Sequence, residues 1–239
     1  MLNFKKADTF IVFTFILLEV IIYILFLLLD GKVISLEVDS SYFKYAGIIL
    51  CLIFSLFGFY KNKKFINILI PIALVFTLIS DYFLLFNTNP SLFTYGLYTF
   101  ICAQLIYFVF IVCKRRSIKE FILNLILRIT LSLVALVSAN SLGFNDLLTN
   151  LALIYFVELV SNFIYSFWLI KENKLMFIFA IGLLLFIACD INVALNNVQI
   201  FEGIDYHIVN YLMRVFYLPS QVMLSLTNVL AKNSNLTIA

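Results

Sequence analysis

The sequence predicts an all-α integral membrane protein that crosses the bilayer eight times as a single transmembrane domain, residues 1–239. Of its 239 residues, 64% are hydrophobic and 12% are charged, and the mean hydropathy is +1.10, far from the composition of soluble domains. Apolar runs of about 20 residues, the length needed to cross a bilayer, recur along the chain. Cationic residues gather in alternate loops between these runs, which is typical of a multi-pass protein.

Short charged or turn-forming segments mark where each apolar run ends. The longest of them, 30–42, separates the first two runs, and the lysine-rich segment 61–64 separates the second from the third. The first run follows a basic start, as a secretory signal would. It is too long for a signal core, however, and no small-residue cleavage site follows, so we expect it to be retained. The eight predicted spans are 9–29, 43–60, 65–86, 92–113, 118–138, 147–170, 175–197 and 208–230.

The loops support this count through their charges. When they are assigned alternately to two sides, twelve of the 16 Lys and Arg residues fall on one side, two on the other and two within predicted helices. Such an asymmetry predicts that the cationic side, which includes both termini, is cytoplasmic. The twelve are Lys5, Lys6, Lys61, Lys63, Lys64, Lys114, Arg115, Arg116, Lys119, Lys171, Lys174 and Lys232, and the opposite two are Lys32 and Lys44.

The cysteines and the single histidine do not indicate a cofactor site. Cys51, Cys102, Cys113 and Cys189 lie in or at the ends of predicted helices without paired spacing, which disfavours a disulfide framework or a zinc site. His207 is interpreted as a solvated loop residue. We therefore expect no metal and no cofactor. The net charge of +3 follows from the loop asymmetry and gives no indication of nucleic-acid binding.

Ionisable and amide side chains inside the predicted spans are the main candidates for function. A charge at the bilayer centre costs about 2.5–3.5 kcal/mol on insertion scales. Each such residue is therefore expected to have a partner or a polar cavity. The ionisable residues are Glu19, Asp81, Arg128, Glu158, Asp190 and Arg214, and the amides are Gln104, Asn162, Asn192 and Gln221.

Two of the acids are expected at the same depth. Asp81 follows the start of its span by 16 residues and Asp190 follows the start of its span by 15, and both spans begin on the predicted cytoplasmic side. At a rise of about 1.5 Å per residue, both carboxyl groups reach the outer half of the bilayer. Arg214, six residues into the last span, reaches nearly the same level from the other side. Two acids and one base are thus predicted to share a plane.

Two interpretations of these charges follow from the sequence. In the first they are structural pairs between helices, Asp81 or Asp190 with Arg214 and Glu19 or Glu158 with Arg128. In the second, two carboxyl groups crowded into one weakly polar site retain a proton between them. A retained proton is what acid catalysis or proton-coupled transport requires.

An internal repeat of four plus four parallel helices is a further interpretation, with chance similarity as its alternative. Both the third and the seventh span carry an acid followed by an asparagine, and both the fourth and the eighth carry a glutamine near mid-helix. Parallel repeats of this kind are known in transporters. The matching residues are Ser80, Asp81, Asn87 and Gln104 in one half, and Cys189, Asp190, Asn196 and Gln221 in the other.

Five motifs, read in order, carry a family resemblance. They occupy 80–84 (SDYFL), 96–100 (GLYTF), 103–107 (AQLIY), 186–190 (FIACD) and 216–221 (FYLPSQ). Their order, spacing and placement on helices resemble the YhhN-like family of multi-pass membrane proteins, whose characterised members are lysoplasmalogenases. The family pattern runs G-D-x-x-L, then G-x-x-x-F with A-H-x-x-Y, then a second S-D, then T-Y-Y-x-A-Q. The resemblance spans roughly residues 76–226.

The resemblance implies site residues by position. Asp81 and Asp190 match the two intramembrane acids of the family and are implied to be catalytic. Tyr107, Tyr217 and Gln221 match its tyrosines and its late glutamine, and are implied to line a substrate pocket.

Three positions depart from the family pattern, and one of them bears on activity. Gln104 stands where the family usually has histidine, Ser80 replaces a glycine, and Pro219 interrupts the last motif. We expect Gln104 to line the pocket and Arg214 to hold a lipid phosphate. The loss of the histidine raises the alternative of a divergent substrate or an inactive relative.

The implied reaction is hydrolysis of the vinyl ether bond of a lysoplasmalogen, with a lysophospholipid or another amphiphilic lipid as the bound partner. The implied location is the bacterial cytoplasmic membrane. Two other functions fit the same residues: a proton-coupled transporter or lipid flippase, and a non-catalytic lipid-binding protein. The sequence does not indicate the lipid head group, the oligomeric state, or which aspartate is the acid and which the base.

Overall fold

The structure, a computed structural model, describes residues 6–34, 37–86, 89–115, 117–198 and 206–230. Among these residues it contains helices and turns and no strand, so the prediction of an all-α fold is confirmed. Each of the eight predicted runs is an α-helix. They are α1 (Lys6–Asp30), α2 (Ser40–Lys61), α3 (Phe65–Leu85), α4 (Pro90–Arg115), α5 (Ile118–Ser141), α6 (Leu147–Trp168), α7 (Leu175–Val198) and α8 (Tyr206–Leu230), with a short 3-10 turn, η1 (Leu169–Lys171), after α6.

Carboxylate caps fix the starts of two of these helices. The Asp39 carboxylate accepts a hydrogen bond from the Ser41 backbone N–H at 2.7 Å, and Asp146 accepts one from the Thr149 N–H at 2.9 Å. The first backbone N–H groups of a helix have no partner within the helix, so these side chains satisfy donors that would otherwise be unpaired. The caps explain why α2 and α6 begin where the loops end.

Seven helices, α1 to α7, are long and apolar enough to cross a membrane, so the protein is an integral membrane protein. The eighth, α8, is 25 residues long but is not among them, because its C-terminal half carries polar residues such as Gln221 and Asn228. Most residues of α8 from Tyr217 onward are buried inside the bundle. Its polar side chains are therefore solvated by protein rather than by lipid, which lowers its apolar content without exposing it.

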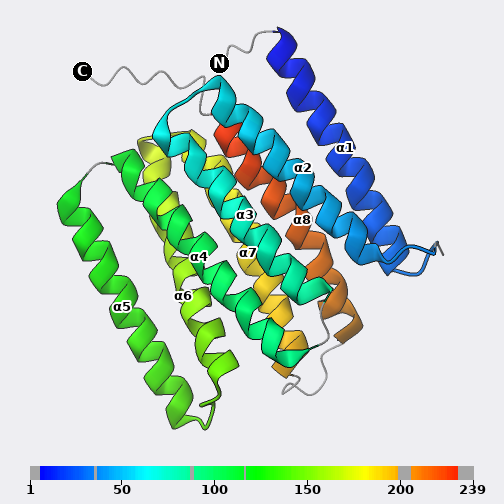
Figure 1. The fold of residues 1–239 in the computed structure, drawn as a ribbon. Helices are drawn as coiled ribbons and strands as arrows, with labels where there is room; N and C mark the ends of the chain where they lie inside the picture. Colours follow the sequence, from blue (N-terminus) through cyan, green and yellow to red (C-terminus); the bar gives the residue numbers. More distant parts are fainter. Residues whose placement is uncertain (1–5, 35–36, 87–88, 116, 199–205, 231–239) are drawn as a thin grey trace.

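The helices form one bundle with two peripheral members (Figure 1). α7 packs along α8 and α3 packs along α4, while α2 lies against α1, α3 and α8. α6 contacts α4, α5 and α7. α1 and α5 lie at opposite edges of the bundle (Figure 1), where large apolar side chains such as Phe13 and Leu123 are exposed to the surroundings, as expected for lipid-facing positions.

Two glycines bring α8 close to its neighbours. A Cβ atom at Gly58 of α2 would lie 2.9 Å from the Val229 side chain and 3.1 Å from the Val229 backbone. A Cβ atom at Gly182 of α7 would lie 3.0 Å from the Leu224 side chain and 3.2 Å from the Leu224 N. Small residues permit close helix contacts in membranes, where packing rather than hydrophobic burial drives association. α8 is thereby held between α2 and α7.

The orientation of the bundle, the single-domain organisation and the four-plus-four repeat stay predictions. Asn87 of the repeat lies outside the described residues, as do Lys5, Arg116 and Lys232 of the cationic set.

Candidate functional site

Asp81 is the centre of a buried polar cluster built by three helices. Its side chain, on α3, is 1% exposed. The Tyr217 hydroxyl of α8 donates a hydrogen bond to Oδ2, and the Lys44 Nζ of α2 lies 3.7 Å from Oδ1. The same Nζ lies 3.7 Å from the centre of the Tyr217 ring. Lys44 therefore compensates the carboxylate charge and makes a cation–π contact with the phenol that donates to Asp81.

Asp190 has a simpler environment on the neighbouring helix α7. The Tyr155 hydroxyl of α6 donates to its Oδ2 at 2.5 Å. Asp190 is partly buried and lies within electrostatic range of Asp81 and Lys44. The two carboxyl groups thus belong to one site, in which each accepts a hydrogen bond from a phenol and the Lys44 ammonium group lies close to Asp81.

Four aromatic rings connect the two carboxyl groups. Tyr155 packs against Phe100 with ring centres 5.5 Å apart, and Phe100 packs against Phe186 at 5.8 Å. Phe186 in turn meets Tyr217 edge-on at 5.8 Å. The phenols that donate to Asp190 and to Asp81 are therefore held by one continuous aromatic layer, which fixes their hydroxyl groups and limits the access of bulk water.

A second polar network surrounds Arg128 of α5. This side chain is 1% exposed and forms an ion pair with Glu158 of α6. Arg128 also donates to Asn124 Oδ1 at 2.6 Å and to Asn162 Oδ1 at 2.9 Å. The Asn162 amide donates to Gln104 Oε1 at 3.0 Å. We call these five residues the Arg128 network; it joins α4, α5 and α6.

Glu19 of α1 lies apart from both groups. It is 2% exposed, and its Oε1 accepts a hydrogen bond from the Cys51 thiol at 3.3 Å. Its Oε2 has no hydrogen-bond partner among the described residues, and a Cβ atom at Gly47 would lie 3.2 Å from it. Of the two acids proposed as partners of Arg128, Glu158 is therefore the one that pairs with it.

A family model described as the YhhN family matches residues 40–228. The chain belongs to the YhhN family. No curated protein and no solved structure shows a significant match. The matched range covers α2 to α7 and most of α8, and thus includes all the residues of the two-aspartate site described above.

Not all of the predicted site residues lie together in this YhhN-family chain. Asp81, Asp190 and Tyr217 do, and Gln221 is buried one turn of α8 beyond Tyr217, with its Nε2 donating to Ser220 Oγ at 3.3 Å. Tyr107 is fully buried, with its ring 5.5 Å from that of Phe179 and its hydroxyl near Thr77. The side-chain oxygen of Gln104 accepts a hydrogen bond from Asn162 in the Arg128 network, and among the described residues no hydrogen bond joins Gln104 to either aspartate.

Arg214 is not the base that accompanies the two acids. It forms an ion pair with Asp30 at the end of α1. The interpretation that pairs Arg214 with Asp81 or Asp190 is therefore wrong, and Lys44 is the cation beside Asp81. Counting residues from the helix ends gave a similar depth for Arg214 but could not give the direction in which its side chain points.

Sequence reasoning missed Lys44 and Tyr155. The alternation of loop charges assigns Lys44 to the predicted outer side, although it lies one residue inside the predicted span 43–60. A lone lysine just inside a span is a signal that could have identified it. Tyr155 lies three and seven residues before Glu158 and Asn162, on the same face of α6. That periodicity indicates an inward-facing hydroxyl, but the sequence alone does not connect it with Asp190.

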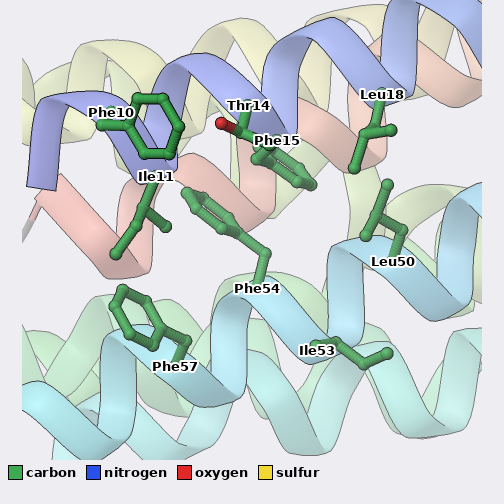
Figure 2. A pocket seen from close by; sticks show the side chains of 9 residues that line it. All are labelled: Phe10, Ile11, Thr14, Phe15, Leu18, Leu50, Ile53, Phe54 and Phe57. Carbon is green, nitrogen blue, oxygen red and sulfur yellow. The ribbon is translucent and has the colours of Figure 1, made fainter. Parts of the chain in front are cut away.

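A separate apolar groove lies between α1 and α2, with a volume of about 300 Å³ (Figure 2). None of the predicted catalytic or substrate-binding residues lines it. In the part of the chain that the structure describes, no group of three or more His, Cys, Asp or Glu residues is arranged to hold a metal ion.

Proposed function

We propose that this YhhN-family chain hydrolyses the vinyl ether bond of lysoplasmalogen lipids, using the carboxyl groups of Asp81 and Asp190. The family includes hydrolases, and membership in it supports a hydrolytic role; the choice of a vinyl ether substrate is part of the proposal. The observation that carries it is the pair of neighbouring carboxyl groups, each hydrogen-bonded to a phenol, in the interior of a membrane protein.

Two carboxyl groups can supply the acid and the carboxylate that cleavage of an enol ether requires. Its cleavage begins when an acid protonates the outer carbon of the double bond, which leaves an oxocarbenium-like cation. A carboxylate stabilises that cation and orients the water that captures it. The same division of labour between two carboxyl groups operates in glycosidases.

The surroundings of the two acids support an assignment of roles. Asp81 lies beside the Lys44 ammonium, which stabilises a carboxylate. Asp190 receives its hydrogen bond from the neutral Tyr155 phenol and has no ion pair among the described residues. We therefore assign Asp190 as the acid that protonates carbon and Asp81 as the carboxylate that accepts a proton from water.

The proton balance closes over one turnover. Asp190 gives its proton to carbon as the C=C bond is lost, and water adds to the cation as Asp81 accepts a proton, giving a hemiacetal. Asp81 then returns that proton to the ether oxygen as the C–O bond breaks, and Asp190 accepts the proton of the hemiacetal hydroxyl. One water is consumed, a fatty aldehyde and a glycerophospho-alcohol are released, and both acids return to their starting states.

The remaining predicted residues are proposed to bind the substrate. Tyr217 and Gln221 follow one face of α8 inward from the site. Arg214 lies three residues before Tyr217, on the side of the predicted outer surface, where it would meet the lipid phosphate in competition with Asp30. Tyr107 and Gln104 form no hydrogen bond with either carboxyl group among the described residues, and we propose that they border the hydrocarbon chain.

The test is aldehyde release by purified protein supplied with a lysoplasmalogen, with an ester lysophospholipid as the comparison substrate. We expect aldehyde from the former and no fatty acid from the latter. Asp81→Asn and Asp190→Asn should each reduce the rate at least about 100-fold, the usual range for loss of a general acid or base. Asp146→Asn, which changes an exposed helix cap, is the matched control and should keep full activity. Wild-type rates in both site variants would disprove the assignment.

A second candidate is a lipid-binding protein without catalysis. The observation that favours it is Gln104, which replaces the usual histidine of the family and accepts a hydrogen bond from Asn162. Stoichiometric binding of intact lysoplasmalogen without any aldehyde would support this candidate. Substrate movement across vesicles driven by a pH gradient, again without products, would instead support a transporter.

A further inference from the structure

The groove between α1 and α2 has the lining of a hydrocarbon-binding site. Eight of its nine lining residues are apolar, and the ninth is Thr14 (Figure 2). Phe15 and Phe54 form its floor, with their rings stacked at 3.8 Å. The rim is exposed: Phe10 is 70% and Ile53 is 57% exposed. The groove opens on the side of the bundle, where the bilayer lies.

Its length fits one leaflet. The lining of α1 runs from Phe10 to Leu18, eight steps along the helix, which at about 1.5 Å per step span roughly 12 Å. Half of a hydrocarbon core of about 30 Å is roughly 15 Å. A single acyl chain extended parallel to the helices would therefore lie in the groove over most of the depth of its leaflet.

One end of the groove is cationic. Phe57 of the lining lies 4.5 Å from the Lys61 Nζ, and Lys61 also pairs with Asp8. Beyond it, Lys63 and Lys64 are exposed in the short turn to α3. Lysines close to a membrane surface attract anionic lipids, each contributing about 1 kcal/mol.

Several lysines gather around the turn at this end of the groove. Lys114, at the end of α4, lies within electrostatic range of Lys64, so two like charges adjoin the same turn. Within the part of the chain that the structure describes, Lys61 pairs with Asp8, whereas Lys63, Lys64 and Lys114 form no ion pair. An anion placed over the turn would relieve this repulsion.

We propose that the groove and the lysine turn together bind one anionic phospholipid of the leaflet at the lysine-rich end of the bundle. One acyl chain lies between Phe10, Phe54 and Ile53, and the anionic head group lies against Lys63 and Lys64. This site is separate from Asp81 and Asp190, and it holds lipid as a bound component, whatever reaction those acids perform.

The experiment measures lipid retained by the intact protein. Detergent-purified protein is incubated with equal amounts of phosphatidylglycerol and phosphatidylcholine of the same chains, washed, and analysed by native mass spectrometry. We expect one phosphatidylglycerol per chain, retained about tenfold over phosphatidylcholine. Lys63→Ser together with Lys64→Ser should abolish this preference. Thr14→Trp, which fills the groove, should lower the retention of phosphatidylglycerol several-fold.

A matched control distinguishes filling of the groove from a general effect of an added tryptophan side chain. Ile129→Trp places the same side chain at an exposed position of α5 and should leave lipid retention unchanged. Equal retention of both lipids by the wild type, or unchanged retention in Thr14→Trp, would overturn the proposal. Displacement of the bound phospholipid by equimolar lysophospholipid would also overturn it, because the groove would then be a site for the substrate chain.

Discussion

At the scale of single residues, Lys44 has the greatest influence on the proposed chemistry. Its Nζ contacts both Asp81 and the ring of the phenol that donates to Asp81. Removing the ammonium would leave a buried carboxylate with a neutral donor, much like Asp190. The difference between the two acids, on which the assignment of roles rests, would then be lost.

Lys44 variants test this difference. Lys44→Met should lower kcat for aldehyde release by about 10- to 100-fold, because the carboxylate form of Asp81 loses its counter-charge. Lys44→Arg keeps the charge and should recover most of the rate. The measurement is a pH profile of kcat for both variants, in which Lys44→Met displaces the profile and Lys44→Arg does not. If both variants match the wild type over the whole range, Lys44 has no part in the reaction.

For the buried Arg128–Glu158 ion pair, removing one charge should cost more stability than removing both. Glu158→Gln leaves the buried Arg128 without its counter-charge and should destabilise the protein by about 3–5 kcal/mol. Arg128→Met combined with Glu158→Leu removes both charges and should cost much less. Thermal unfolding in detergent measures the two variants. An equal loss in the single and the double variant would show that the pair is not coupled.

At the scale of elements, the sequence was sufficient to place all eight helices, because apolar runs bounded by charged loops reflect a physical requirement of the bilayer. The ends differ mainly where caps or turns decide them: α2 starts at Ser40 after its Asp39 cap, not at Phe43, and α5 continues to Ser141. α8 was predicted as an ordinary span, whereas the structure shows a helix whose polar residues are buried by α2 and α7.

The cap of α6 predicts a pH dependence of stability. Hydrogen bonds from Thr149 lower the pKa of the Asp146 carboxyl below its ordinary value of 3.8. A carboxyl with a lowered folded-state pKa contributes stability above its unfolded pKa, and loses that contribution as the pH falls through the folded value. Asp146→Ala should therefore unfold at a lower temperature than the wild type at neutral pH.

The difference in unfolding temperature should shrink as the pH falls below the ordinary value of 3.8 and through the lowered folded-state pKa of Asp146. Asp146→Asn is the control, because an uncharged amide caps the helix equally at neutral and at acidic pH. Its unfolding temperature relative to Asp146→Ala should not depend on pH. A gap between wild type and Asp146→Ala that is constant across this range would show that the charge has no role in the cap.

At the scale of the whole molecule, what the sequence could not provide is the set of contacts between distant helices. The equal depth of Asp81 and Asp190 followed from helix length, and the two acids do belong to one site. Lys44 could not be assigned to it, since a residue count gives a height but no rotation about the helix axis. The same limit explains why Arg214, at nearly the right height, pairs with Asp30 instead.

Orientation is the property on which access to the site depends. The turns that follow α2 and η1 carry lysines and lie at one end of the bundle. The turn that contains Gly143 lies at the opposite end of the bundle. The positive-inside rule predicts that the lysine-rich end is cytoplasmic. Asp81 and Asp190 lie in the halves of α3 and α7 remote from that end, so substrate would enter from the outer leaflet.

Single cysteines introduced into a cysteine-free variant test this orientation in intact cells. Gly143→Cys should react with a membrane-impermeant thiol reagent, whereas Lys63→Cys and Glu172→Cys should react only after the membrane is opened. All three residues are exposed, so a difference in reactivity reflects the side of the membrane and not burial within the protein. The reverse pattern would place the two aspartates near the cytoplasmic surface, and the substrate would then come from the inner leaflet. The lipid bound at the lysine-rich end would in that case be an outer-leaflet lipid.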